Sequence, residues 1–292
     1  MTRRYSARGL TVVELLAIVV VVVVIMAVLM PVINPRRNHG ARQMKDARQV
    51  RCIPQAMAIW ANDNNGLFPL PSVIDAANTT VGEEGSAKDT TANILSVLVY
   101  TGGISVELTI SPAESNTSSI VQDDDYMFDV PETALDPANA LWDPAFAADF
   151  TNGRIGNTSY AHVLPGGGRG ELWRDLWRDT SAATEPVIGN RGPQVASVNA
   201  SGVPTFALAS SNTFLIHGSR KSWEGNVAYN DCHVAFETRT NPDGVRYRNT
   251  AGKKRSDNLF FDEPDDATGH NAWMSIWTTA GDAKADFTPI WD

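Results

Sequence analysis

The sequence predicts an α+β protein in which a long amino-terminal helix, membrane-spanning in its first half, packs on an antiparallel β-sheet with loop-rich insertions. Three observations support this prediction. Residues 15–33 contain no charged side chain, and apolar residues after them recur at three- and four-residue steps. Near the carboxyl terminus, two alternating apolar segments flank a short polar turn, which is typical of a β-hairpin.

The apolar run from Leu15 to Ile33 predicts the first half of the helix. It is 19 residues long, and at about 1.5 Å per residue it covers roughly 28 Å, close to the hydrocarbon thickness of a bilayer. We therefore expect a transmembrane helix over residues 10–34. Glu14 stands at its start, and an unpaired carboxylate at mid-membrane costs about 2.5–3.5 kcal/mol. Glu14 therefore requires a specific role.

Two ordinary explanations of this segment fit less well. A cleaved secretory signal needs a small-x-small site after its apolar core, and Met30–Asn34 contains none. A plain signal anchor leaves Glu14 and the Gly9-Leu10 junction unexplained. Basic residues do not fix the orientation, because three arginines precede the run and three follow it.

The residues around the junction resemble a known motif. They are Arg8-Gly9-Leu10-Thr11-Val12-Val13-Glu14-Leu15. This segment is similar to the cleavage and methylation motif of type IV prepilins and type II secretion pseudopilins. In that family a membrane peptidase, the prepilin peptidase, cuts after the glycine and methylates the new amino terminus. The glutamate is then the fifth residue of the mature chain, as Glu14 would be. Leu10 departs from the usual phenylalanine.

The resemblance implies roles for four residues. Cleavage would fall between Gly9 and Leu10, and Leu10 would carry the N-methyl group. Glu14 would neutralise the amino group of a neighbouring subunit during assembly, and Pro31 would kink the helix. The implied protein is a single-pass inner-membrane protein with a periplasmic or extracellular pilin-like head. Its domains would be a leader (1–9), the assembly helix (10–34), its amphipathic continuation (35–66) and the head (67–292).

The amphipathic continuation has one apolar face. The residues that share it at helical spacing are Ala47, Val50, Ile53, Met57 and Trp60. We expect this face, Trp60 and Met57 in particular, to pack under the sheet. Pro54 predicts a kink, since it lacks the N–H of a helical hydrogen bond. Asn62–Gly66 supplies turn formers and a terminal glycine that end the helix.

The head contains several shorter predicted elements. We expect helical turns at 93–100 and 171–179, and strands at 157–164 and 213–216. Residues 226–229 and 233–237 predict a hairpin, and the turn at 241–244 leads to a further strand of an antiparallel meander at 245–248. The segments 60–69 and 225–234 also resemble the helix exit and the strand-turn-strand signature of pseudopilin-like proteins.

Charge and cysteine content limit the partners. The net charge of −9 becomes −12 if residues 1–9 are removed, because three arginines and no acid leave with them. An acidic head predicts no nucleic-acid partner. Cys52 and Cys232 lack metal-ligand spacing, so isolated thiols are favoured over a disulfide. We expect no cofactor. The alternative is calcium at Asp123-Asp124-Asp125, which more often form a solvated loop.

No enzymatic motif is present in the sequence. His217 and His233 lie near Arg220, Glu224 and Asp231, but strand alternation does not bring His233 and Asp231 together. The expected function is therefore structural: a subunit of a type IV pilus-like or type II secretion pseudopilus filament, with the prepilin peptidase, other subunits and the inner membrane as partners. The alternative is a membrane-anchored periplasmic protein that binds sugar or peptide and does not polymerise.

Overall fold

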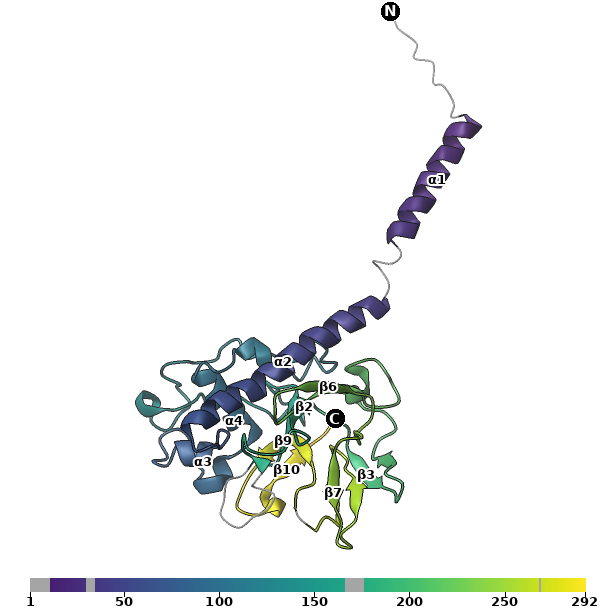
Figure 1. The fold of residues 1–292 in the computed structure, drawn as a ribbon. Helices are drawn as coiled ribbons and strands as arrows, with labels where there is room; N and C mark the ends of the chain where they lie inside the picture. Colours follow the sequence, from purple (N-terminus) through teal and green to yellow (C-terminus); the bar gives the residue numbers. More distant parts are fainter. Residues whose placement is uncertain (1–10, 30–34, 166–175, 268) are drawn as a thin grey trace, which may run out of the picture. The chain divides into compact units, whose positions relative to one another are not determined.

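The computed structural model describes residues 11–29, 35–165, 176–267 and 269–292 (Figure 1). The chain divides into two compact units, residues 1–41 and residues 42–292. In the first unit, the helix α1 extends over Val12–Leu29. A second helix, α2, extends over Pro35–Asp63 and continues into the second unit. Proline is tolerated at the first position of α2 because no helical N–H is needed there.

The predicted membrane-spanning half of the helix is wrong. Among the residues that the structure describes, no helix is both long and apolar enough to cross a membrane. The described part of α1 has 18 residues, about 27 Å at 1.5 Å per residue, whereas a span needs about 20 predominantly apolar residues. The fold is therefore an antiparallel sheet with helices, and none of the described helices is a membrane-spanning one. The predicted single-pass transmembrane helix and the inner-membrane localisation depended on that span, and both are wrong.

The second unit is built on a six-stranded sheet in the order β10-β9-β1-β2-β5-β6. Its strand pairs are antiparallel, as predicted, but the number and order of the strands were not predicted. Its strands are β1 (Tyr160–Val163), β2 (Pro186–Asn190), β5 (Gly225–Tyr229), β6 (Val234–Glu237), β9 (Met274–Thr279) and β10 (Thr288–Ile290). Every residue of β1, β2 and β5 is buried. The central strands are therefore covered on both faces, since successive side chains point to opposite sides.

Smaller elements surround the sheet. Two two-stranded sheets pair β3 (Val195–Val198) with β4 (Pro204–Phe206), and β7 (Arg246–Arg248) with β8 (Lys254–Ser256). The short α-helices are α3 (Pro71–Ile74) and α4 (Thr91–Tyr100). The 3₁₀ turns are η1 (Gly85–Lys88), η2 (Val106–Thr109), η3 (Pro137–Asn139), η5 (Asn212–Leu215) and η6 (Lys284–Asp286).

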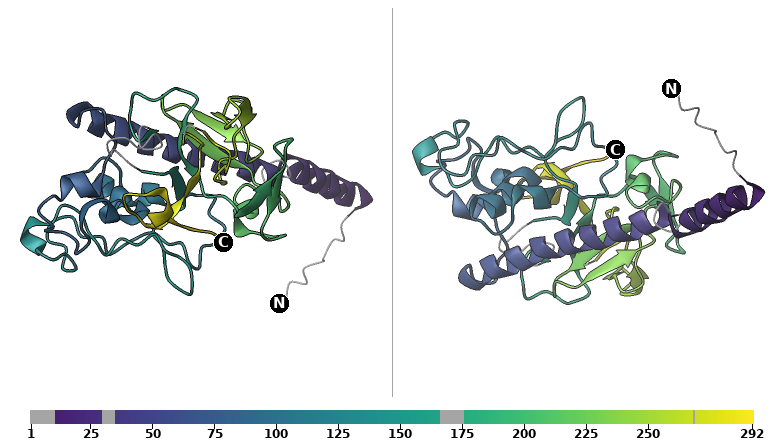
Figure 2. Two further views of the ribbon diagram at one scale, coloured as in Figure 1. Left: turned by 90° about the horizontal axis from the view of Figure 1, so that it is seen from below. Right: turned by 90° about the horizontal axis from the view of Figure 1, so that it is seen from above.

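The helices α2 and α4 cover the same face of the sheet. Tyr160 and His162 are two residues apart on β1, so their side chains share a face. The Tyr160 hydroxyl donates to Asp46 of α2, and His162 contacts Thr91 of α4. In both views of Figure 2, the part of α2 in the second unit crosses the head beside the strands.

The buried face of α2 differs from the predicted one at both ends. Met57 lies in the core with Val227 and Tyr229 of β5, as expected. Trp60 is only half-buried and does not belong to the core, so its predicted burial is wrong. Toward the amino-terminal end of α2, Asp46 and Gln49 are buried instead, and Ala47 is only half-buried. Within residues 40–63, where the burial of α2 is described, the buried residues are Asp46, Gln49, Val50, Ile53, Pro54, Ala56, Met57 and Ala61.

Three predictions for the head are confirmed and two are wrong. The helix at 93–100, the strand within 157–164 (β1) and the hairpin of β5 and β6 are present. Cys232 occupies its turn with a φ of 63°, a conformation rare outside glycine and asparagine. The strand predicted at 213–216 is the 3₁₀ turn η5. The strand at 245–248 exists as β7, but it pairs with β8 instead of extending a meander. Most of the helix predicted at 171–179 lies outside the described residues.

Candidate functional site

The start of α1 is closed by a reciprocal capping box. The Thr11 hydroxyl accepts a hydrogen bond from the Glu14 backbone N–H at 3.3 Å. The Glu14 carboxylate accepts from the Thr11 backbone N–H at 2.8 Å and from its hydroxyl at 2.9 Å. These bonds, first from the backbone and then from the side chain of Thr11, lower the pKa of Glu14. Thr-x-x-Glu is a sequence signature of this cap, so the sequence alone could have assigned Glu14 a local role.

The body of α1 presents apolar side chains in every direction. All residues from Thr11 to Ile25 are exposed, including the valine run 19–24. A helix that is hydrophobic all round is normally buried against other apolar surface. Exposed apolar area of this extent marks an interaction surface. The remaining predicted site residues, Gly9, Leu10 and Pro31, lie outside the described residues.

A buried carboxylate joins α2 to the sheet. Asp46 has no exposed surface. Its oxygens accept hydrogen bonds from Ser111 at 2.5 Å, Tyr160 at 3.1 Å and the Asn226 amide at 2.6 Å. His217 Nε2 lies 3.2 Å from the same carboxylate. Burial, with the negative charge of Asp46, raises the pKa of Tyr160 well above its usual range. The phenol therefore stays protonated and acts as a donor.

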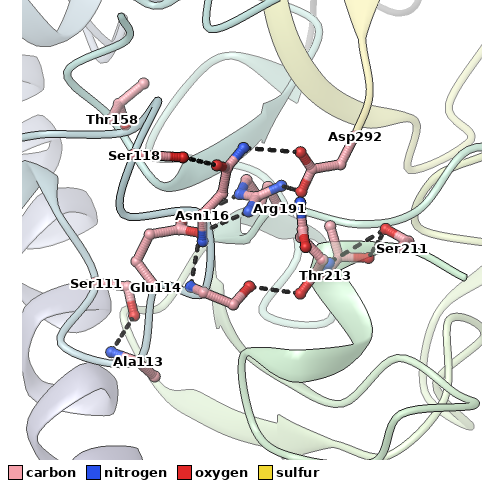
Figure 3. A network of polar contacts seen from close by, with 12 residues as sticks. Ser111, Ala113, Glu114, Asn116, Ser118, Thr158, Arg191, Ser211, Thr213 and Asp292 are labelled. Carbon is pink, nitrogen blue, oxygen red and sulfur yellow. Dashed lines mark hydrogen bonds and ion pairs between the residues drawn. The ribbon is translucent and has the colours of Figure 1, made fainter.

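A buried ion triad fixes the segment after β10 to the sheet. Figure 3 shows Arg191 lying between Glu114 and Asp292. The guanidinium donates to both Glu114 oxygens, at 3.1 Å and 2.5 Å, and to Asp292. Burial alone would raise the pKa of Glu114, but the charge and hydrogen bonds of Arg191 lower it. The Asn116 amide also donates to Asp292 at 3.0 Å.

The structure gives the two candidate histidines different partners. His217 contacts Asp46 and Asn190, both buried. His233 Nδ1 lies 2.5 Å from Asp231, and its ring stacks on Tyr229 with 4.5 Å between the ring centres. The prediction that His233 and Asp231 do not meet is therefore wrong: the tight turn at Cys232 brings them together.

The remaining candidate groups are dispersed. Cys52 and Cys232 are half-buried free thiols, as favoured by the sequence. Asp123, Asp124 and Asp125 form local turn contacts, with Gln122 donating to Asp124 at 2.8 Å. No group of three or more potential metal-ligating side chains occurs within the described ranges.

Sequence reasoning missed several buried charged residues, three of which are Asp46, Arg191 and Lys88. Lys88 pairs with Asp75 at 2.9 Å, and both side chains are buried. Of the three, Asp46 alone had a local signal, because it precedes Val50 by four and Ile53 by seven residues on the apolar face. The comparisons add no family to this picture: no family model, no curated protein and no solved structure matches the chain.

Proposed function

We propose that this chain is a structural subunit of a helical filament of the type IV pilus or type II secretion pseudopilus kind, processed by a prepilin peptidase between Gly9 and Leu10. The observation that carries the proposal is the position of Glu14. It is the only charged residue of α1 and stands in the first turn of a helix whose other side chains are apolar.

The apolar surface of α1 supplies the driving force for assembly. Burying apolar area contributes about 25 cal/mol per Å², or roughly 0.8 kcal/mol per methylene group. Packing α1 of one copy against α1 of its neighbours would remove the exposed surface of residues 12–25 from water. Van der Waals packing of valine and leucine side chains would then hold the filament together.

The charge of Glu14 would set the position of each subunit along the axis of its neighbour. Cleavage after Gly9 would expose a positively charged amino group at Leu10, and an apolar bundle tolerates that charge only beside an opposite one. The carboxylate of a neighbouring copy is such a partner. Within the single chain, the Glu14 carboxylate accepts two hydrogen bonds, both from Thr11 and both at the same oxygen. A carboxylate has about four lone-pair sites, so it can accept a further donor.

The experiment separates the cap of Glu14 from its charge. Glu14→Gln retains the capping box, since glutamine also serves at this position, but it removes the charge. Thr11→Ala removes the cap and retains the charge. We expect Glu14→Gln to reduce incorporation into filaments at least tenfold, and Thr11→Ala to reduce it by less than threefold. Cross-linking between subunits and recovery of sheared filaments measure both.

Two controls complete the test. Glu132→Gln removes an exposed carboxylate from the head and should leave incorporation unchanged. Amino-terminal sequencing of the wild-type protein should begin at Leu10, and Gly9→Ala should prevent that processing. Equal cross-linking in wild type and Glu14→Gln, or a mature chain that begins at Met1, would refute the proposal.

A further inference from the structure

A group of exposed basic side chains lies on the hairpin of β7 and β8. Residues 246–255 carry five basic side chains, although the whole chain has a net charge of −9. All five are exposed: Arg246, Arg248, Lys253, Lys254 and Arg255. Among the described residues, none of them forms an ion pair with a carboxylate.

The strand register gathers three of these charges on one face. Arg248 stands directly opposite Lys254, and Arg246 is two residues before Arg248. Side chains two apart on a strand, or directly opposite across a pair, share a face of the sheet. Arg255 stands opposite Tyr247, so it belongs to the other face. Like charges directly opposite each other destabilise a strand pair, and a bound anion would remove that cost.

A cavity of about 420 Å³ adjoins this face, a size within the range of about 300–1,000 Å³ typical of small-molecule sites. Its lining residues are Thr184, Glu185, Gly244, Arg246, Tyr247, Arg248, Lys254 and His270. Three of these side chains are basic and belong to the hairpin: Arg246, Arg248 and Lys254.

Local hydrogen bonds hold the two arginines in place. Arg246 Nε donates to the Asp243 carbonyl at 3.1 Å, and one terminal nitrogen of Arg248 donates to the Gly252 carbonyl at 3.2 Å. The remaining guanidinium N–H groups stay available. Guanidinium groups bind carboxylate, phosphate and sulfate oxygens through paired N–H donors, and preorganisation reduces the entropy lost on binding.

We infer that this cavity binds a doubly charged tetrahedral oxyanion, sulfate or phosphate, through Arg246, Arg248 and Lys254. The neighbouring cavity of about 620 Å³ shares Arg246 and Lys254 but also contains Glu263 and Asp265, which oppose an anion. Arg248 and His270 line the smaller cavity and not the larger one.

The test is calorimetric titration of the full chain with sodium sulfate at constant ionic strength, in a mild detergent that covers α1. We expect saturable binding at one site. Arg248→Gln and Lys254→Gln should each weaken it at least tenfold. Lys253→Gln and Arg255→Gln remove the same charge from the same hairpin and should weaken it less than threefold. All four side chains are exposed, so thermal unfolding should be unchanged.

Three outcomes would overturn the inference. The first is the absence of saturable sulfate binding to the wild-type chain. The second is an equal loss in all four variants, which would mean general attraction to a basic hairpin. The third is a loss in Arg255→Gln as large as that in Arg248→Gln, which would place the anion in the larger cavity.

A second measurement uses Glu185, the one carboxyl group in the lining. Burial raises the pKa of Glu185 to about 7, so above that pH its negative charge opposes the anion. Sulfate stays a dianion throughout. Affinity should therefore fall between about pH 6 and pH 8, and Glu185→Gln should reduce the fall. The other titratable lining groups, Arg246, Tyr247, Arg248, Lys254 and His270, are unchanged in that variant. An identical pH dependence in wild type and Glu185→Gln would count against the assignment.

Discussion

The carboxylate of Asp46, on α2, accepts a hydrogen bond from the side-chain amide of Asn226, on β5, at 2.6 Å, and both side chains are buried. The two residues are 180 positions apart in the chain. The same amide reaches the Gln43 carbonyl at 3.3 Å. This contact fixes the amino-terminal end of the packed part of α2 against β5, whose residues Val227, Ala228 and Tyr229 belong to the apolar core.

Asp46→Ala should destabilise the second unit by about 3–5 kcal/mol, because it leaves Ser111, Tyr160 and Asn226 without their buried acceptor. Chemical denaturation of the two proteins measures the loss. Asp63→Ala, an exposed acid on the same helix, is the matched control and should change stability by less than about 0.5 kcal/mol. Equal effects of the two substitutions would show that the Asp46 contacts contribute nothing.

Arg191→Met should lower the free energy of unfolding by about 3–5 kcal/mol, because the carboxylate of Glu114 would remain buried without its cation. The exposed pair of Arg154 and Asp149 gives the control: Arg154→Met should cost less than about 1 kcal/mol. Combining Arg191→Met with Glu114→Gln should recover part of the loss, since the uncompensated charge is then gone. A double variant less stable than Arg191→Met would contradict this account.

The stability of the fold should decrease as pH falls from 6.5 to about 4 through His162. Its Nδ1–H donates to the Val163 carbonyl at 2.7 Å, and Nε2 accepts from the Thr91 hydroxyl at 2.9 Å, which fixes the neutral ring. Burial lowers the pKa of His162 from 6.5 to about 4. In that window the unfolded chain binds a proton that the folded chain does not, so acid favours unfolding.

Protonation of His162 should lower the free energy of unfolding by roughly 3 kcal/mol once the pH has fallen below about 4. Other groups titrate in the same range, so the measurement is the difference in pH dependence between wild type and His162→Gln. The assignment fails if the profiles of His162→Gln and wild type run parallel from pH 7 to pH 4.

Trp177→Ala should destabilise the head far more than Trp60→Ala. Trp177 has no exposed surface, packs edge-on against Phe68 with 5.7 Å between the ring centres, and donates from its indole nitrogen to the Pro69 carbonyl at 3.0 Å. Its loss should cost about 3–5 kcal/mol. Trp60 is half-buried outside the core, so its loss should cost much less. Thermal unfolding should therefore show a lower melting temperature for Trp177→Ala than for Trp60→Ala.

The local sequence patterns predicted the elements that local forces determine. Thr91–Tyr100 forms a helix because its apolar residues follow helical spacing, and Gly102, with a φ of 74°, follows its end. The hairpin of β5 and β6 formed from two alternating segments around a polar turn. The apolar character of α1 and the Thr11–Glu14 signature were also readable in the sequence.

What the sequence could not determine was which residues from distant segments share the interior. Strand order depends on pairings such as β1 with β9, which join residues more than 100 positions apart. Local patterns carry no information about such pairings, because loop closure links distant segments at a cost that grows only slowly with length. The burial of Asp46 and Arg191 was likewise decided by tertiary contacts, since a charge enters the core only where partners from other segments satisfy it. The sequence by itself thus determined the apolar helix and the hairpin, and the tertiary structure decided the strand order, the buried charges and the incomplete burial of Trp60.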